Sequence, residues 1–90
     1  MCTYITVTTD VEGSAKGPGG KWFKITDAAA YYDHPVHAMA EHTLNVDLTD
    51  PSAGPGQRIA LELTAASAQR LIDSIQQALD AAPDELKAAG

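Results

Sequence analysis

The sequence lacks the features that would suit it to nucleic acid, to a membrane or to an oxidising compartment. Six Lys and Arg residues stand against twelve Asp and Glu, for a formal net charge of -6, whereas phosphate groups and anionic lipids are bound by clustered basic side chains. No apolar run approaches the roughly 20 residues of a membrane-spanning helix. The single cysteine excludes an internal disulfide, and the first residues do not resemble a signal peptide. We therefore expect a cytoplasmic protein that binds neither nucleic acid nor a membrane.

The chain does have the composition of a folded globular protein. It is 44% hydrophobic and 20% charged, which is too apolar for disorder. Ninety residues are enough for one domain with a modest core. We expect a single α+β domain over residues 1–90.

Alternation of apolar and polar residues predicts four β-strands, over residues 2–11, 21–32, 42–49 and 57–63. Stretches rich in glycine and proline at 12–20 and 50–56 predict loops. The alanine run at 28–30 is helix-prone, but it is short and ends in two tyrosines, so we expect an extended strand with a bulge.

A single helix is expected to follow the strands. Thr64 is the predicted N-cap, and the helix should end near Ala82 because Pro83 disfavours helical geometry in the residue before it. Its apolar stripe consists of Ala68, Leu71, Ile72, Ile75 and Leu79.

The order of these elements predicts a four-stranded antiparallel meander with one C-terminal helix packed on one face (ββββα). Alternation assigns an apolar face to the residues Ile5, Val7, Leu44, Val46, Leu48, Ile59, Leu61 and Leu63. It assigns the opposite face to Tyr4, Thr6, Thr8, Trp22, Lys24, Thr43, Asn45, Asp47, Arg58 and Glu62. One helix leaves much of such a sheet open and edge strands invite pairing, so we expect a homodimer.

All three histidines lie between residues 33 and 42, and this clustering suggests a site. If a short helix begins after Asp33, then His34, His37 and Glu41 share one face. If the segment is a loop, His34, His37 and His42 can converge. Imidazole and carboxylate suit zinc or copper, and three protein ligands leave an open catalytic position in which Glu41 could act as a base. The first hypothesis is therefore a divalent metal site at His34, His37, Glu41 and His42.

Other interpretations of the same residues remain open. The spacing matches no strong metal motif, and His42, next to Leu44, is typical of a buried structural histidine. A metal-free homodimeric binding module is the alternative, in which Tyr4, Trp22, Tyr31 and Tyr32 line a groove or a dimer interface on a sheet face that could also take a small-molecule ligand. A metal-free enzyme using His and Glu as an acid–base pair ranks last, because one pocket in so short a chain is shallow. Cys2 has no basic neighbour in sequence that would activate its thiol.

Three segments resemble a family of small uncharacterised actinobacterial proteins. They are residues 1–4, residues 31–37 and residues 41–45. The resemblance covers nearly the whole chain, including Leu63 and Thr64 at the start of the helix. It implies no activity, because none is established for that family, and implies only that the opening tetrapeptide and the histidine segment belong together.

Overall fold

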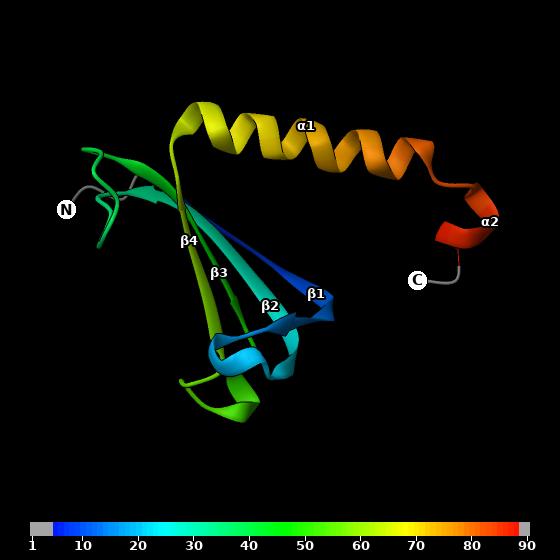
Figure 1. Cartoon of the computed structure of the whole chain (residues 1–90), viewed down its shortest axis with the longest axis horizontal. Coiled ribbons are helices and arrows are strands. Elements are labelled where there is room, and N and C mark those ends of the chain that lie inside the picture. Colours follow the sequence, from blue (N-terminus) through cyan, green and yellow to red (C-terminus); the bar gives the residue numbers. More distant parts are fainter. Residues whose placement is uncertain (1–4, 89–90) are drawn as a thin grey trace.

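Four antiparallel strands followed by a helix make up residues 5–88, the part of the chain that the computed structural model describes (Figure 1). The strands are β1 (Thr6–Lys16), β2 (Trp22–Asp33), β3 (Thr43–Thr49) and β4 (Arg58–Leu63), and they pair in chain order. The helices are α1 (Ala65–Ala81) and the single turn α2 (Asp84–Lys87). Short 3-10 turns occupy Pro18–Gly20 and Pro51–Ala53. The predicted ββββα fold is confirmed.

The pairing register separates the sheet into an apolar and a polar face, because successive side chains on a strand point to opposite sides. Val46 of β3 lies opposite Ala30 and Leu61 on the two neighbouring strands. Matched positions on this apolar face are Val7, Ala28, Ala30, Leu44, Val46, Leu48, Ile59, Leu61 and Leu63. The polar face carries Thr6, Thr8, Tyr31, Asn45, Asp47, Arg58 and Glu62.

The first strand is longer than predicted. Residues 12–16, expected to be loop, continue β1 and pair with the beginning of β2. A register shift between Asp10 and Gly13 accommodates an extra residue, so the expected bulge lies in β1 and not in β2. The side chain of Ile25 lies over Gly13, 3.8 Å from where a Cβ would stand, and this cover lets a glycine stay in the ladder.

The predicted positions of Trp22 and Lys24 on the polar face are wrong. Trp22 pairs with Lys16, and β2 has no extra residue between it and Ala28. Alternation therefore places Trp22, like Ala28 and Tyr32, on the apolar side of the sheet. The indole is 66% exposed and adds to the uncovered apolar surface there.

Both predicted ends of the main helix are confirmed. Thr64 caps α1, since its side-chain oxygen accepts a hydrogen bond from the backbone N–H of Ser67 at 3.2 Å. The helix ends at Ala81, just before Ala82 and Pro83. No helix among residues 5–88 is long and apolar enough to cross a membrane.

The apolar surfaces of sheet and helix are only partly covered. The helix packs on β3 and β4, but it leaves the end of β4 and runs away from the strands (Figure 1). No hydrophobic side chain among residues 5–88 is fully buried. The helix stripe remains between 42% and 58% exposed at Leu71, Ile72, Ile75 and Leu79.

The dimensions of the chain show the same openness. Its accessible surface is 6751 Å², whereas a compact monomer of this mass exposes about 5,000 Å². Its radius of gyration is 14.7 Å, against about 12 Å for a compact domain of this length. The single chain thus exposes about 1,700 Å² more than a closed monomer would.

Candidate functional site

The histidine segment is an irregular loop between β2 and β3. Of the two alternatives for this segment, the short helix after Asp33 is absent, and the helical face of His34, His37 and Glu41 does not form. Asp33 instead accepts a hydrogen bond from the backbone N–H of His34 at 2.7 Å, which favours a turn. The helix-prone sequence is overridden because the backbone N–H groups of this loop have partners elsewhere.

Two of the three histidines lie together where the loop begins and ends. The rings of His34 and His42 are stacked with centroids 4.5 Å apart, and Tyr32 stacks on the other side of His42 at 5.9 Å. The pairing of Asp33 with Thr43 closes the two strands, so the residues that flank this pair meet. His42 is therefore half-buried between aromatic rings, at the apolar side expected for it.

The hydrogen bond of His34 fixes its tautomer. Its Nδ1 lies 2.9 Å from the backbone carbonyl oxygen of Glu41. A carbonyl only accepts, so Nδ1 is the donor and the lone pair of the neutral ring lies on Nε2. This is the arrangement that orients many metal-binding histidines.

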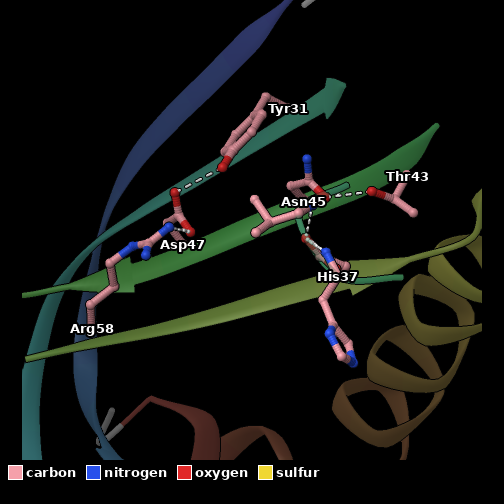
Figure 2. A network of polar contacts seen from close by, with 8 residues as sticks. Tyr31, His37, Thr43, Asn45, Asp47 and Arg58 are labelled. Carbon is pink, nitrogen blue, oxygen red and sulfur yellow. Dashed lines mark hydrogen bonds and ion pairs between the residues drawn. The ribbon is translucent and has the colours of Figure 1, made fainter. Parts of the chain in front are cut away.

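The other two predicted ligands are not brought to this pair. His37 is exposed, and Figure 2 shows its imidazole directed away from Asn45 and Asp47. Glu41 is exposed and contacts His34 through its backbone carbonyl. Within residues 5–88, no group of three or more His, Cys, Asp or Glu side chains is arranged to hold a metal ion.

A carboxylate on β4 holds the loop over the polar face of the sheet. Glu62 accepts hydrogen bonds from the backbone N–H groups of three consecutive residues, Val36, His37 and Ala38, at 2.5, 3.1 and 2.8 Å. The bonds from Val36 and Ala38 hold the pKa of Glu62 below its ordinary value, because they favour the ionised form. The three N–H groups thus form an anion-binding site in the backbone, and the carboxylate of Glu62 is the anion that fills it.

The most buried side chains of the described part are polar and lie on the same face. Thr43 is fully buried, Asn45 is 6% exposed, and the hydroxyl of Thr43 donates to the side-chain oxygen of Asn45 at 2.6 Å (Figure 2). Burying a polar group is costly unless it is hydrogen-bonded. Thr43 and Asn45 are hydrogen-bonded to each other, so this buried pair forms a fixed floor of the polar face.

Next to this floor lies a three-residue polar network across β2, β3 and β4. The Tyr31 hydroxyl donates to Asp47 at 3.1 Å, and the Arg58 guanidinium pairs with the same carboxylate at 2.7 Å (Figure 2). Burial, followed by the hydrogen bond to Asp47, raises the pKa of Tyr31 above its ordinary value of 10.0. The contacts with Asp47 hold the side chains of Arg58 and Tyr31 in place before any ligand binds.

These groups surround a hollow of about 660 Å³, a volume within the range of small-molecule sites. Its lining residues are Tyr31, Asp33, His34, Val36, His37, Ala38, Asn45, Asp47, Arg58, Ala60, Leu61 and Glu62. The hollow therefore combines carboxylates, a guanidinium, an amide and a phenol on one surface.

The predicted aromatic lining does not form on one face. Tyr31 and Tyr32 are successive residues of β2 and point to opposite sides, with Tyr31 at the hollow and Tyr32 at the histidine stack. Trp22 belongs to the apolar side. Tyr4 and Cys2 lie outside the described residues.

Apart from Trp22 and Lys24, alternation assigned the polar face correctly, but the sequence analysis gave no role to Asn45, Asp47, Arg58 and Glu62. Alternation was the available signal, because it places these side chains on one side of two adjacent strands. The capture of the loop by Glu62 joins residues 24 to 26 positions apart and has no local signal.

Comparisons with known proteins give a family and nothing about chemistry. No curated protein and no solved structure matches the chain. The model of a family of unknown function, DUF6295, matches residues 1–88. The resemblance to a family without known function is confirmed at that level, and the chain belongs to the DUF6295 family.

Proposed function

We propose that this chain is a homodimeric binding module of the cytoplasm, in which two copies cover their apolar surfaces and leave the polar face to a small polar ligand. The observation that carries the proposal is the open apolar surface, with no hydrophobic side chain fully buried among residues 5–88. Burial of apolar area is the main force that folds a chain. A second copy supplies the burial that one chain leaves incomplete.

The preset polar groups support the ligand part of the proposal. Asp47 holds Arg58 and Tyr31 in place, and Asn45 is fixed by Thr43, so the groups are ordered before binding. Preorganised side chains lower the entropic cost of ligand capture. A guanidinium beside carboxylates suits a small molecule that carries both acceptor and donor groups.

Light scattering of the purified chain at micromolar concentration tests the dimer. We expect a mass about twice the 9.4 kDa of one chain. A mass of one chain across the micromolar range would overturn the proposal, because the apolar faces would then remain open in solution.

Chemical-shift mapping with a panel of amino acids, dicarboxylates and polyols tests the hollow. A binder should shift the backbone signals of Ala38, Asn45 and Asp47, and Arg58→Gln should weaken that binding. Arg70→Gln is the control, since Arg70 bonds Ser67 on the helix away from the hollow. If no member shifts these signals, the polar network has a structural role only.

We also propose a metal site as a second candidate, because one observation favours it. The rings of His34 and His42 are only 4.5 Å apart, and two neighbouring imidazoles are ligands that zinc and copper accept. Rotation of one ring would let both imidazoles bind zinc or copper. A third ligand, His37 or Glu41, requires movement of the loop.

Zinc titration by calorimetry, with protein made without a histidine tag, tests this site. His42→Ala should abolish zinc uptake, whereas His37→Ala, whose ring lies apart, should weaken it less. Affinity should fall below about pH 6, because protons compete for imidazole nitrogen. Equal zinc binding by wild type and His42→Ala would contradict the site.

A further inference from the structure

We propose that the dimer is built by exchange of helices, so that α1 of each copy lies on the apolar sheet face of the other copy. This rests on the homodimer proposed above and names the two surfaces that meet. Within residues 5–88, the helix stripe and the sheet face are apolar surfaces that one chain covers only in part, and each is the kind of surface that the other needs. A two-fold axis places the helix stripe of each copy on the sheet face of the other, so that both surfaces are covered in both copies.

The short connection between β4 and α1 keeps the helix from lying across the apolar sheet face of its own chain. Only Thr64 separates Leu63, the last residue of β4, from the first residue of α1. Thr64 is held through its side chain and through its backbone carbonyl. Its side-chain oxygen accepts a hydrogen bond from the backbone N–H of Ser67, and its carbonyl oxygen accepts one from the backbone N–H of Ala68 at 2.8 Å. Without a flexible linker, the direction in which α1 leaves the sheet is set by this cap (Figure 1).

The lengths and side chains of the two surfaces match. The 17 residues of α1 span about 25 Å, and the seven residues of β3 span roughly 23 Å. On β2 the apolar face offers the small side chains of Ala28 and Ala30, opposite Val7 and Thr9. Small residues let a helix approach a sheet closely, and Val7 is 57% exposed.

Few charges lie at this contact. The helix stripe contains no charged residue, and Lys16 and Lys24 lie on the apolar side of the sheet beside Trp22, in the hairpin of β1 and β2, although each chain carries a net charge of -6. The charged groups of β3 and β4, such as Asp47 and Arg58, are on the opposite face. Two copies can therefore meet through these surfaces without bringing like charges together.

The area agrees with a permanent dimer. The chain exposes 6751 Å², about 1,700 Å² more than a compact monomer. Covering that excess in both copies buries roughly 3,400 Å², which lies within the range of obligate homodimers and far above chance contacts.

Cross-linking between differently tagged copies tests the exchange. One copy carries Val7→Cys and the other Ile75→Cys, both in a Cys2→Ser background. The copies are mixed, unfolded, refolded together and treated with a short bismaleimide. We expect the main covalent product to join the two different copies, and the product to vanish when Gln77→Cys, on the far side of the helix, replaces Ile75→Cys.

Each other result overturns the exchange, and light scattering tells which claim has failed. A dimer that gives chiefly Ile75→Cys to Ile75→Cys links has helix against helix. A dimer that gives chiefly Val7→Cys to Val7→Cys links has sheet against sheet. In both cases, and if a dimer gives no link, the homodimer stands and the exchange is wrong. A monomer by light scattering refutes both.

Discussion

The substitution Ile75→Ala on α1 should weaken the dimer by a calculable amount. Ile75 is 52% exposed in the single chain, so about half of its side chain is left for a partner to cover. Full burial of such a side chain stabilises by about 1.5–3 kcal/mol, so the uncovered half contributes about 0.8–1.5 kcal/mol per copy. The substitution occurs twice in a homodimer, which gives about 1.5–3 kcal/mol, or a dissociation constant raised about 10- to 150-fold.

Sedimentation equilibrium over a dilution series measures this change. Gln77→Ala is the matched control, since Gln77 is exposed and lies two residues further along, on nearly the opposite side of the helix. It should leave the dissociation constant within about threefold of wild type, a change of about 0.6 kcal/mol. If Ile75→Ala changes the constant no more than Gln77→Ala does, the stripe is not in the interface.

Three further changes test the rest of the structure. Glu62→Gln should speed hydrogen exchange at the amides of Val36 and Ala38. The folded state lowers the pKa of Glu62 below 4.5, so the stabilisation from Glu62 is present above that pH and is lost as pH falls through the folded pKa. Glu62→Gln should therefore make the melting temperature less dependent on pH on the acid side. An unchanged pH profile would contradict the role of Glu62 in holding residues 36–38. Asp47→Asn should bring the pKa of Tyr31 down toward 10.0 in a titration of tyrosinate absorbance, with Tyr31→Phe identifying the signal; no change would mean that burial alone sets it. Thr64→Ala should cost about 1 kcal/mol in urea unfolding at fixed protein concentration, whereas Ser74→Ala, which removes only a bond to the Arg70 carbonyl within the helix, should cost less.

The elements with simple periodicity could be predicted closely. Residues 42–49 and 57–63 alternate cleanly, and the strands found are Thr43–Thr49 and Arg58–Leu63. The cap at Thr64 was readable because a hydroxyl before a helical stripe satisfies backbone donors. The loop predicted at residues 12–16 was wrong, because Gly13 stays in the ladder by pairing with Ile25 of β2, a contact that has no local signal.

The histidine segment shows where local signals end. Pro35 and the run 38–40 favour a helix when considered alone, but Glu62 takes the N–H groups of residues 36–38 from a distant strand. The contact of His34 with His42 could have been derived, since Asp33 pairs with Thr43 and the next residues out must meet. The position of the loop over the polar face could not have been derived from the sequence, because it depends on the tertiary contact with Glu62.

Hydrogen exchange of α1 as a function of protein concentration tests the central claim most directly, because it reports whether a second copy covers the helix. We expect the amides of residues 71–79 to be protected at high micromolar concentration and to exchange faster on dilution, in step with dissociation measured by light scattering. The amides of β3, which is paired on both sides within one chain, should change less. Exchange in α1 that is fast and independent of concentration would contradict a helix covered by a second copy.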